Sequence, residues 1–510
     1  MLTFDRDLAE RVVAERYPSE GPHYLEKIVQ AAFEVPAVTP KDLREAFLAE
    51  VNATCPGKEG EDRVRVMNIV LGLVTPLLRS PRDLKRLIGM LQVTWPVVAS
   101  DVDRADFIAM EALRLFRPAI YRAIRANPER LTGGARSSAH RPARDLAPEY
   151  DRLLLHGLSE EEQSQMRLTL PRLFPRLAAV WGNTHYNDEN DWRRRRLVCT
   201  AERFPTYFRF ALGEDLLPAK NISELVERAN DREFIQATLR QALQETLKSG
   251  RTRASVYLEE LAVHAPEVAK DHIGPLDSAL FEIADELDVK SDEGRGMYDL
   301  VNNSLRIHWL LNALVRDRMA QRERVRVLRT VMKSASLYWY CDFAERCRLD
   351  HEPEQHGKTT PDDQRYVDRK TADELVKQAL RRLRKTATDG TLGQQRRLVS
   401  MLYKWARFSP RGLKEVRPKA IKLLANDEFV KHLGLDTFSI GWSHSVGFGG
   451  TGDLVAKGAP QVNKQAIREL VNEKEFLGRL RGKLGSATDK AEIIFWKLNI
   501  DTWEKPEEKL

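Results

Sequence analysis

The densest basic run in the sequence lies at Trp192–Arg196, where one tryptophan precedes four consecutive arginines. Guanidinium groups bind phosphate oxygens, and an indole ring can stack on a nucleic-acid base. The run is therefore a candidate contact to a nucleic-acid backbone. The alternative is a helix turn whose charges face solvent or a partner protein, because charge runs commonly occupy solvated helix faces. The residues concerned are Trp192, Arg193, Arg194, Arg195 and Arg196.

Two further basic clusters lie downstream of this run. They keep a role in nucleic-acid binding open, although acidic residues between them limit the clustered charge that such binding requires. The first cluster contains Arg322, Arg324, Arg326 and Arg329, and the second contains Arg381, Arg382, Arg384 and Lys385.

The sequence contains no motif for a complete catalytic or metal site. The stretch Gly447–Gly452 (GFGGTG) is rich in glycine but lacks the Lys-Ser or Lys-Thr that completes a phosphate-binding loop, so we expect a turn there. Cys341 and Cys347 are six positions apart, a spacing that does not match zinc-binding pairs. We expect them to be buried free thiols, and we predict no catalytic residue and no metal ligand.

The composition excludes several classes of protein. The chain has 510 residues, of which 42% are hydrophobic and 31% charged, with a net charge of +7 and four cysteines. A chain of this length and apolar content can bury several cores, which argues against wholesale disorder. So few cysteines exclude a disulfide scaffold.

No segment of the sequence is a candidate membrane helix. The longest apolar run, Val66–Leu78, contains Asn68 and Pro76, and it is shorter than the roughly 20 residues that a spanning helix needs. The charged residues of the range 5–7 leave no room for the apolar stretch of a secretory signal peptide. We therefore expect a cytoplasmic protein.

The spacing of apolar residues predicts a mainly α-helical fold. Helical periodicity recurs in residues 82–95, 373–385 and 396–407, whereas strand patterns are confined to Met1–Phe4 and Ser439–Trp442. In the first helical segment the apolar positions are Leu84, Leu87, Ile88, Leu91 and Trp95.

Two residue pairs have the spacing of a helix capping box. Ser159 precedes Glu162 by three positions, and Thr371 precedes Glu374 by three positions. In such a box each side chain bonds the backbone N–H of the other residue, so we expect helices to begin after Ser159 and after Thr371.

Segments rich in Gly, Pro, Ser or polar residues mark the expected domain boundaries. They are 131–148 and 349–361, and a further glycine-rich loop is expected at Gly441–Gly458. The predicted domains are a helical region over 1–130, a helical middle domain over 149–348 and a helical C-terminal domain over 362–510.

Three short segments together resemble one known family. Phe4–Arg6 (FDR) ends a strand-like stretch, Tyr24–Ile28 (YLEKI) follows a predicted helix, and Arg82–Arg86 carries an Arg-Asp-x-Lys-Arg signature. These segments resemble the KAP family of P-loop NTPases, specifically the part that follows the Walker B strand. The resemblance is specific over Leu2–Leu131 and looser as far as about Leu261.

The resemblance implies a nucleotide-dependent role, with ATP and Mg²⁺ as cofactors. The Walker A loop and the Mg²⁺-binding Walker B acid of the family would precede Met1, and the 510-residue sequence does not contain them. We therefore expect a C-terminal portion of such an NTPase, unable to hydrolyse ATP or to bind a cofactor tightly by itself. Its expected fold is a helical lid-like subdomain followed by further helical domains, with at most a remnant strand of the P-loop α/β core at the N-terminus.

The resemblance also identifies candidate nucleotide-sensing residues. Arg82 and Arg86 are four positions apart and so share one helix face, from which they could contact a γ-phosphate. Their alternative role is that of two solvated arginines opposite the leucine stripe. Asp5 and Arg6 follow the strand-like segment, whose end would lie near the nucleotide in a complete P-loop fold. Their alternative state is a frayed terminus.

Two functions remain from the sequence. The first is a nucleotide-state-sensing lid that couples to a protein partner or effector, with the NTPase half or an adjacent subunit as a further partner; the family resemblance connects it with bacterial anti-phage defence. The second is a stand-alone helical scaffold that binds protein or nucleic acid without nucleotide chemistry. An independent enzyme with an unrecognised site is the weakest alternative, because no residues cluster as such a site requires.

Overall fold

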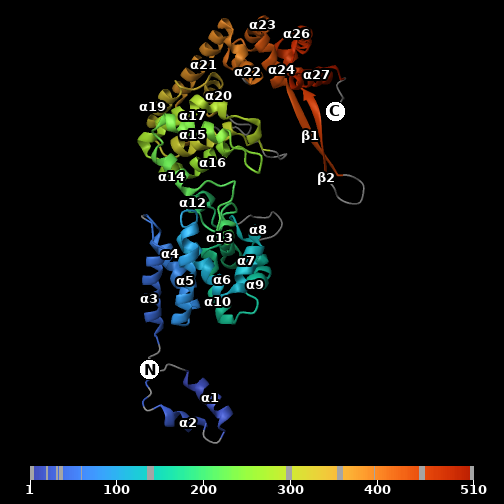
Figure 1. Cartoon of the computed structure of the whole chain (residues 1–510). Coiled ribbons are helices and arrows are strands. Elements are labelled where there is room, and N and C mark those ends of the chain that lie inside the picture. The colour runs from blue at the N-terminus through green and yellow to red at the C-terminus, as the bar shows by residue number, and fades with distance from the viewer. Residues whose placement is uncertain are drawn as a thin grey trace. The chain divides into compact units, whose positions relative to one another are not determined.

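The computed structural model describes residues 5–18, 21–29, 31, 33, 38–58, 60–134, 143–294, 301–352, 360–395, 397–446 and 454–505. These residues form helices and one two-stranded sheet, which confirms the mainly α-helical fold (Figure 1). The chain separates into two compact units, unit 1 over residues 1–187 and unit 2 over residues 188–510. The division into three domains stays a prediction.

Unit 1 is built around one helix, α6, that is buried on all sides. Residues Ala105 to Leu113 of α6 are all buried, including Asp106 and Glu111, whose charges are paired with Arg65 and Arg114. The helices of unit 1 are α1 (Arg6–Arg16), α2 (Gly21–Ile28), α3 (Pro40–Thr54), α4 (Arg63–Ile69), α5 (Pro81–Val98), α6 (Arg104–Phe116), α7 (Pro118–Ala126), α8 (Pro128–Leu131), α9 (Ala147–Leu154), α10 (Glu160–Thr169) and α11 (Arg176–Gly182).

Helix α5 packs its predicted apolar stripe against α3 and α6. The helix begins where the Ser80 hydroxyl accepts a hydrogen bond from the Asp83 N–H, with Pro81 at its first position. The ring of Trp95 lies 5.7 Å from that of Phe107 on α6. The predicted stripe is confirmed, because Leu84, Leu87, Ile88, Leu91 and Trp95 are all buried.

One of the two predicted capping boxes is confirmed and the other is wrong. Ser159 and Glu162 exchange both hydrogen bonds of a capping box at the start of α10. Helix α21 instead begins at Arg369, and its N-cap is Asp368, whose carboxylate accepts from the Thr371 N–H at 2.9 Å. Because Asp368 already caps the helix, Thr371 lies one turn further in and is buried.

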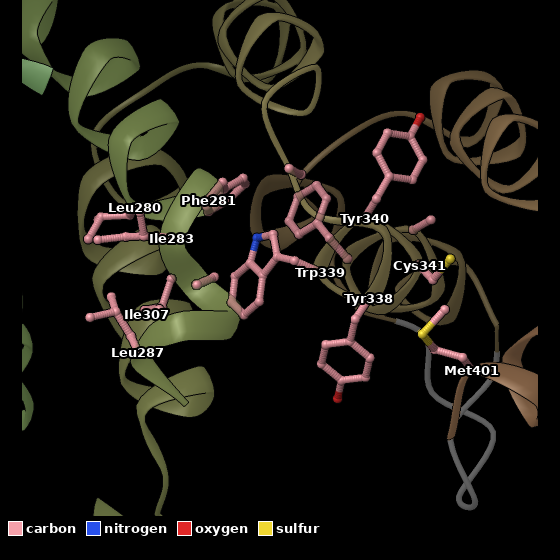
Figure 2. Close-up of a cluster of buried hydrophobic side chains, with 14 of the residues drawn as sticks. Leu280, Phe281, Ile283, Leu287, Ile307, Tyr338, Trp339, Tyr340, Cys341 and Met401 are labelled. Atoms are coloured by element: carbon pink, nitrogen blue, oxygen red, sulfur yellow. The ribbon is translucent and has the colours of Figure 1, made fainter. Parts of the chain in front are cut away.

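Unit 2 has a single continuous hydrophobic core that runs from Leu217 to Trp503. Figure 2 shows part of this core, where the Trp339 ring of α20 points toward the side chains of α17, 5.1 Å from the Phe281 ring. The helices of unit 2 are α12 (Glu189–Arg194), α13 (Thr206–Arg209), α14 (Ala219–Glu227), α15 (Arg232–Leu243), α16 (Arg253–His264), α17 (Ile273–Leu287), α18 (Asn303–Leu311), α19 (Gln321–Val331), α20 (Leu337–Leu349), α21 (Arg369–Asp389), α22 (Leu398–Phe408), α23 (Leu413–Leu423), α24 (Asp427–Thr437), α25 (Lys464–Leu470), α26 (Glu473–Ser486) and α27 (Lys490–Glu504).

The sheet is an antiparallel hairpin of β1 (Phe438–Val446) and β2 (Leu454–Val462) in unit 2. The strand pattern at Ser439–Trp442 is confirmed by β1. The expected loop over Gly441–Gly458 is wrong in extent, because residues up to Val446 and from Leu454 pair through backbone hydrogen bonds, which the glycines do not prevent. The stretch Gly447–Gly452 and the strand expected at Met1–Phe4 lie outside the described residues.

None of the helices found in the described parts of the chain is long and apolar enough to cross a membrane.

Candidate functional site

Arg82 and Arg86 lie on the solvent-exposed face of the first turns of α5. Arg82 makes no hydrogen bond or ion pair with any residue that the structure describes, and the Arg86 guanidinium carbon lies 6.0 Å from the centroid of the Phe116 ring. A contact at that distance is at the outer limit of a cation–π interaction. The predicted pair therefore shares one accessible face, opposite the buried leucines of the same helix.

The other cations beside this face are paired with carboxylates. Lys85 Nζ lies 2.7 Å from Glu50 of α3, and an Arg79 guanidinium nitrogen lies 3.4 Å from Glu162 of α10. Glu162 also pairs with Arg117, and hydrogen bonding at Ser159 together with Arg117 lowers its pKa below the ordinary value. Arg82 thus differs from its neighbours, because no acidic side chain in the described structure neutralises it.

The side chains of Asp5 and Arg6 both form hydrogen bonds within α1. The Asp5 carboxylate accepts from the Leu8 N–H at 2.9 Å and so caps the helix, while the Arg6 Nε donates to Glu10 at 2.8 Å. The strand that was expected to precede them lies outside the described residues. A role for Asp5 and Arg6 near a nucleotide stays a prediction.

The Trp192–Arg196 run packs into unit 2. The Trp192 side chain is only 7% exposed, so its indole does not offer the face for base stacking that was expected from the Trp192–Arg196 run. Arg193 pairs with Glu260 of α16 at 3.3 Å, and both Arg194 and Arg195 pair with Asp191. Arg196 has a left-handed backbone with φ 60°, and its carbonyl oxygen accepts from the Tyr207 hydroxyl at 2.7 Å. Contact of these arginines with nucleic acid stays a prediction.

The structure brings parts of the other two basic clusters together. Arg329 of α19 and Arg382 of α21 line one hollow beside Tyr340 of α20, although they are far apart in the sequence. Two other members are used elsewhere: Arg324 is buried and donates to the Met319 and Arg365 carbonyls, and Arg384 forms a two-bond ion pair with Glu415. Sequence spacing carries no signal for this convergence.

A buried ionic network joins α18, α20 and α22, and sequence reasoning missed it. His308 Nε2 lies 3.0 Å from one carboxylate oxygen of Asp342, and Lys404 Nζ lies 2.8 Å from the other. The His308 ring stacks on Trp339 at 4.4 Å, and burial lowers the His308 pKa. Burial would raise the Asp342 pKa, but the hydrogen bond from His308 and the charge of Lys404 hold it well below the ordinary value. Because the network is enclosed, it positions the three helices.

Cys341 and Cys347 are buried free thiols, as predicted, and Cys55 is buried as well. Burial raises the pKa of the Cys55 and Cys341 thiols to about 12, so both stay protonated and are poor ligands and nucleophiles. No group of three or more His, Cys, Asp or Glu side chains within the described ranges could hold a metal ion. The Asp5 carboxylate serves as a helix cap, and the binding of ATP and Mg²⁺ stays a prediction.

Comparison with protein-family models gives a match in the N-terminal part of the chain. Residues 1–98 match the family model described as the KAP family P-loop domain, which confirms the resemblance over that range. Among the residues described there, the chain forms helices α1–α5 and no strand. No curated protein and no solved structure is significantly similar to the chain.

Proposed function

We propose, from the match of the N-terminal part to the KAP family, that unit 1 acts as a helical lid that responds to the nucleotide state of a P-loop. Unit 2 would then transmit this response to a protein partner or effector. The proposal rests mainly on Arg82. Its side chain is exposed on α5 beside Arg86, has no carboxylate partner among the described residues, and lies within the range that matches the family. An arginine that approaches the γ-phosphate from a lid is suited to detect its loss, because its guanidinium forms paired, charge-assisted bonds to phosphate oxygens.

The phosphate cradle and the Mg²⁺ carrier must come from outside the described residues. The 510-residue sequence contains no Walker A motif, so ATP and Mg²⁺ would bind to a P-loop supplied in the same polypeptide or by another subunit. We assign no hydrolytic step to this chain alone. Its own contribution would be the placement of Arg82 and Arg86 on a helix held rigid by packing against α3 and α6.

The test compares the chain alone with the chain combined with a Walker-motif polypeptide encoded in frame or beside it. ATP binding and hydrolysis are measured with Mg²⁺. We expect neither for the chain alone and both for the combination. Arg82→Ala and Arg86→Ala should each lower hydrolysis by about tenfold or more, whereas the exposed control Lys85→Ala should change it less than about twofold. Tight ATP binding and hydrolysis by the chain alone would refute the proposal.

The family resemblance also supports a role in bacterial anti-phage defence. This part of the proposal is tested by expressing the chain, with its neighbouring genes, in a bacterial host that is then challenged with phages. Protection should be lost in the Arg82→Ala variant if the nucleotide response is required. Equal plaque numbers with and without the wild-type genes would argue against a defence role.

The alternative function is a helical scaffold that binds a protein without nucleotide. It is favoured by Val93 and Val97, which lie one turn apart on α5 with side chains 71% and 63% exposed. Partner binding that is insensitive to nucleotide and to Arg82→Ala, but is lost in Val93→Asp, would support the scaffold over the lid.

A further inference from the structure

Unit 2 contains a hollow of about 310 Å³ between α19, α20 and α21. This volume is at the lower end of the range of ligand-binding pockets, which is about 300–1,000 Å³. It is separate from Arg82 and Arg86, which belong to unit 1. The polar and charged side chains in its lining include Arg329, Lys333, Tyr340, Glu374, Gln378 and Arg382.

Arg382 is held at the wall of the hollow by an aromatic ring. Its guanidinium carbon lies 4.1 Å from the centroid of the Tyr340 ring, and one nitrogen donates to the Ala335 carbonyl at 3.4 Å. The Tyr340 hydroxyl in turn donates to Gln378 Oε1 at 2.8 Å, and burial raises the Tyr340 pKa to about 12. In Figure 2, Tyr340 points away from the core side chains that Trp339 contacts. Arg382 is thus oriented by stacking, and no carboxylate in the described ranges neutralises it.

The remaining charges of the hollow do not balance. Lys333 is exposed and has no ion pair among the residues that the structure describes. Arg329 pairs with Glu374 at 2.8 Å, and both side chains are about half exposed. Three cations therefore face one carboxylate, which leaves a local excess of two positive charges.

Further exposed basic side chains lie on α19 and α21 outside the lining of the hollow. Arg326 lies one turn before Arg329 on α19, and Lys377 and Arg381 lie on α21 next to the lining residues. None of these three lines the hollow or has an ion pair in the described structure, so they add only to the diffuse positive charge of the two helices.

We propose that this hollow, named the α19–α21 pocket, binds the phosphomonoester group of a small organic molecule. A phosphomonoester carries about −1.5 to −2 charge at pH 7, which matches the excess of positive charge. Arg382 offers a planar fork of donors, Lys333 a mobile ammonium group and Gln378 an amide N–H₂ that makes no hydrogen bond in the described structure. The volume left beside the phosphate accommodates the organic part. The proposal does not depend on the lid function of unit 1.

The test uses isothermal titration calorimetry of the full chain with inorganic phosphate, ribose 5-phosphate and ribose. We expect ribose 5-phosphate to bind most tightly, inorganic phosphate more weakly, and ribose not at all. Lys333→Gln and Arg382→Gln should each weaken binding by about tenfold, which corresponds to the loss of one charge-assisted hydrogen bond. The matched control Lys377→Gln, which removes an exposed cation outside the pocket, should change affinity less than about twofold.

A fourth variant gives an effect of opposite sign. Glu374→Gln removes the single carboxylate of the pocket and should strengthen binding, because Arg329 is then released to the ligand. Circular dichroism confirms that each variant is folded, and Lys333 is exposed enough that its substitution leaves the core intact. The double variant Arg82→Ala/Arg86→Ala should bind ribose 5-phosphate as the wild type does, so this test is independent of the proposed lid.

Three outcomes would overturn the proposal. The first is no binding of either phosphate at millimolar concentration. The second is an equal loss of affinity in Lys377→Gln and Lys333→Gln, which would indicate that the ligand is attracted by diffuse surface charge and not bound in the pocket. The third is a single-stranded oligonucleotide without terminal phosphate that competes for the pocket more effectively than ribose 5-phosphate, which would assign the surface to nucleic-acid backbone instead.

Discussion

The ammonium group of Lys404 on α22 lies 2.8 Å from a carboxylate oxygen of Asp342 on α20, with the two side chains only 6% and 20% exposed. Lys404 also bonds to Glu345, one turn further along α20. A cation between two carboxylates in the interior compensates both of their charges, beside His308 at Asp342 and Arg407 at Glu345. This contact therefore connects α20 to α22 across the core of unit 2.

Removal of this cation should destabilise unit 2 strongly. In Lys404→Met the apolar stem is retained, but Asp342 and Glu345 lose their shared partner, so the free energy of unfolding should fall by about 3–5 kcal/mol. Urea denaturation followed by tryptophan fluorescence measures the change. The exposed control Lys414→Met should shift it by less than about 0.5 kcal/mol. A loss below about 1 kcal/mol in Lys404→Met would contradict this role of Lys404 and would show that other partners, His308 and Arg407 among them, compensate the carboxylates.

Glu415 makes the stability depend on pH in the acid range. Its carboxylate accepts two bonds from Arg384, at 2.7 and 2.8 Å, and others from Ser409 and the Trp405 indole. The bonds from Arg384, followed by those from Ser409 and Trp405, lower its pKa to about 2. An unfolded Glu binds a proton near pH 4.3, so this contribution is complete above that pH and is lost as pH falls toward 2.

The pH prediction is checked with Glu415→Gln. The wild type should lose about 1–2 kcal/mol more stability than the variant between pH 5 and pH 2.5, measured by urea unfolding at each pH. Identical pH profiles for the two proteins would mean that the Arg384–Glu415 pair does not contribute to folding.

Gly434 of α24 occupies a position where only a hydrogen fits. A Cβ there would lie 2.9 Å from Leu480 of α26 and 2.9 Å from the Trp496 ring of α27, so Gly434→Ala should destabilise the protein by about 1–3 kcal/mol. Thermal unfolding measures the effect. Gly478→Ala on α26 is the control, because its Cβ would meet no atom within 4 Å, and it should stabilise the helix by about 0.5–1 kcal/mol. Equal effects of the two substitutions would contradict this packing.

Asp368 should stabilise α21 as its N-cap. Asp368→Ala removes the acceptor of the Thr371 N–H and should cost about 1 kcal/mol in urea unfolding. Asp373→Ala, an exposed acidic residue on the same helix, serves as control and should have little effect. If the Asp373 substitution costs as much, the effect reflects helix charge and not capping.

Local sequence patterns predicted the helices, but they did not predict which distant side chains come together in the candidate sites. The leucine stripe of α5 and the Ser159–Glu162 capping box were predictable, because both depend on residues three or four positions apart. The position of Thr371 inside α21 was not predictable from this pattern, because the Asp368 carboxylate, three positions earlier, caps the helix instead. Arg82 and Arg86 were identifiable through a family resemblance, and their shared exposed face follows from helical spacing.

The sequence by itself determined a mainly helical chain, the exposure of Arg82 and Arg86 on α5, and the burial of Cys341 and Cys347 as free thiols. Only the tertiary structure decided which charges meet: it buried Trp192, joined Lys404 to Asp342, and placed Arg329 and Arg382 around one hollow. The physical reason is the distance along the sequence over which each kind of interaction acts. Helical periodicity acts within one or two turns, whereas these contacts join residues tens of positions apart and depend on how whole helices pack.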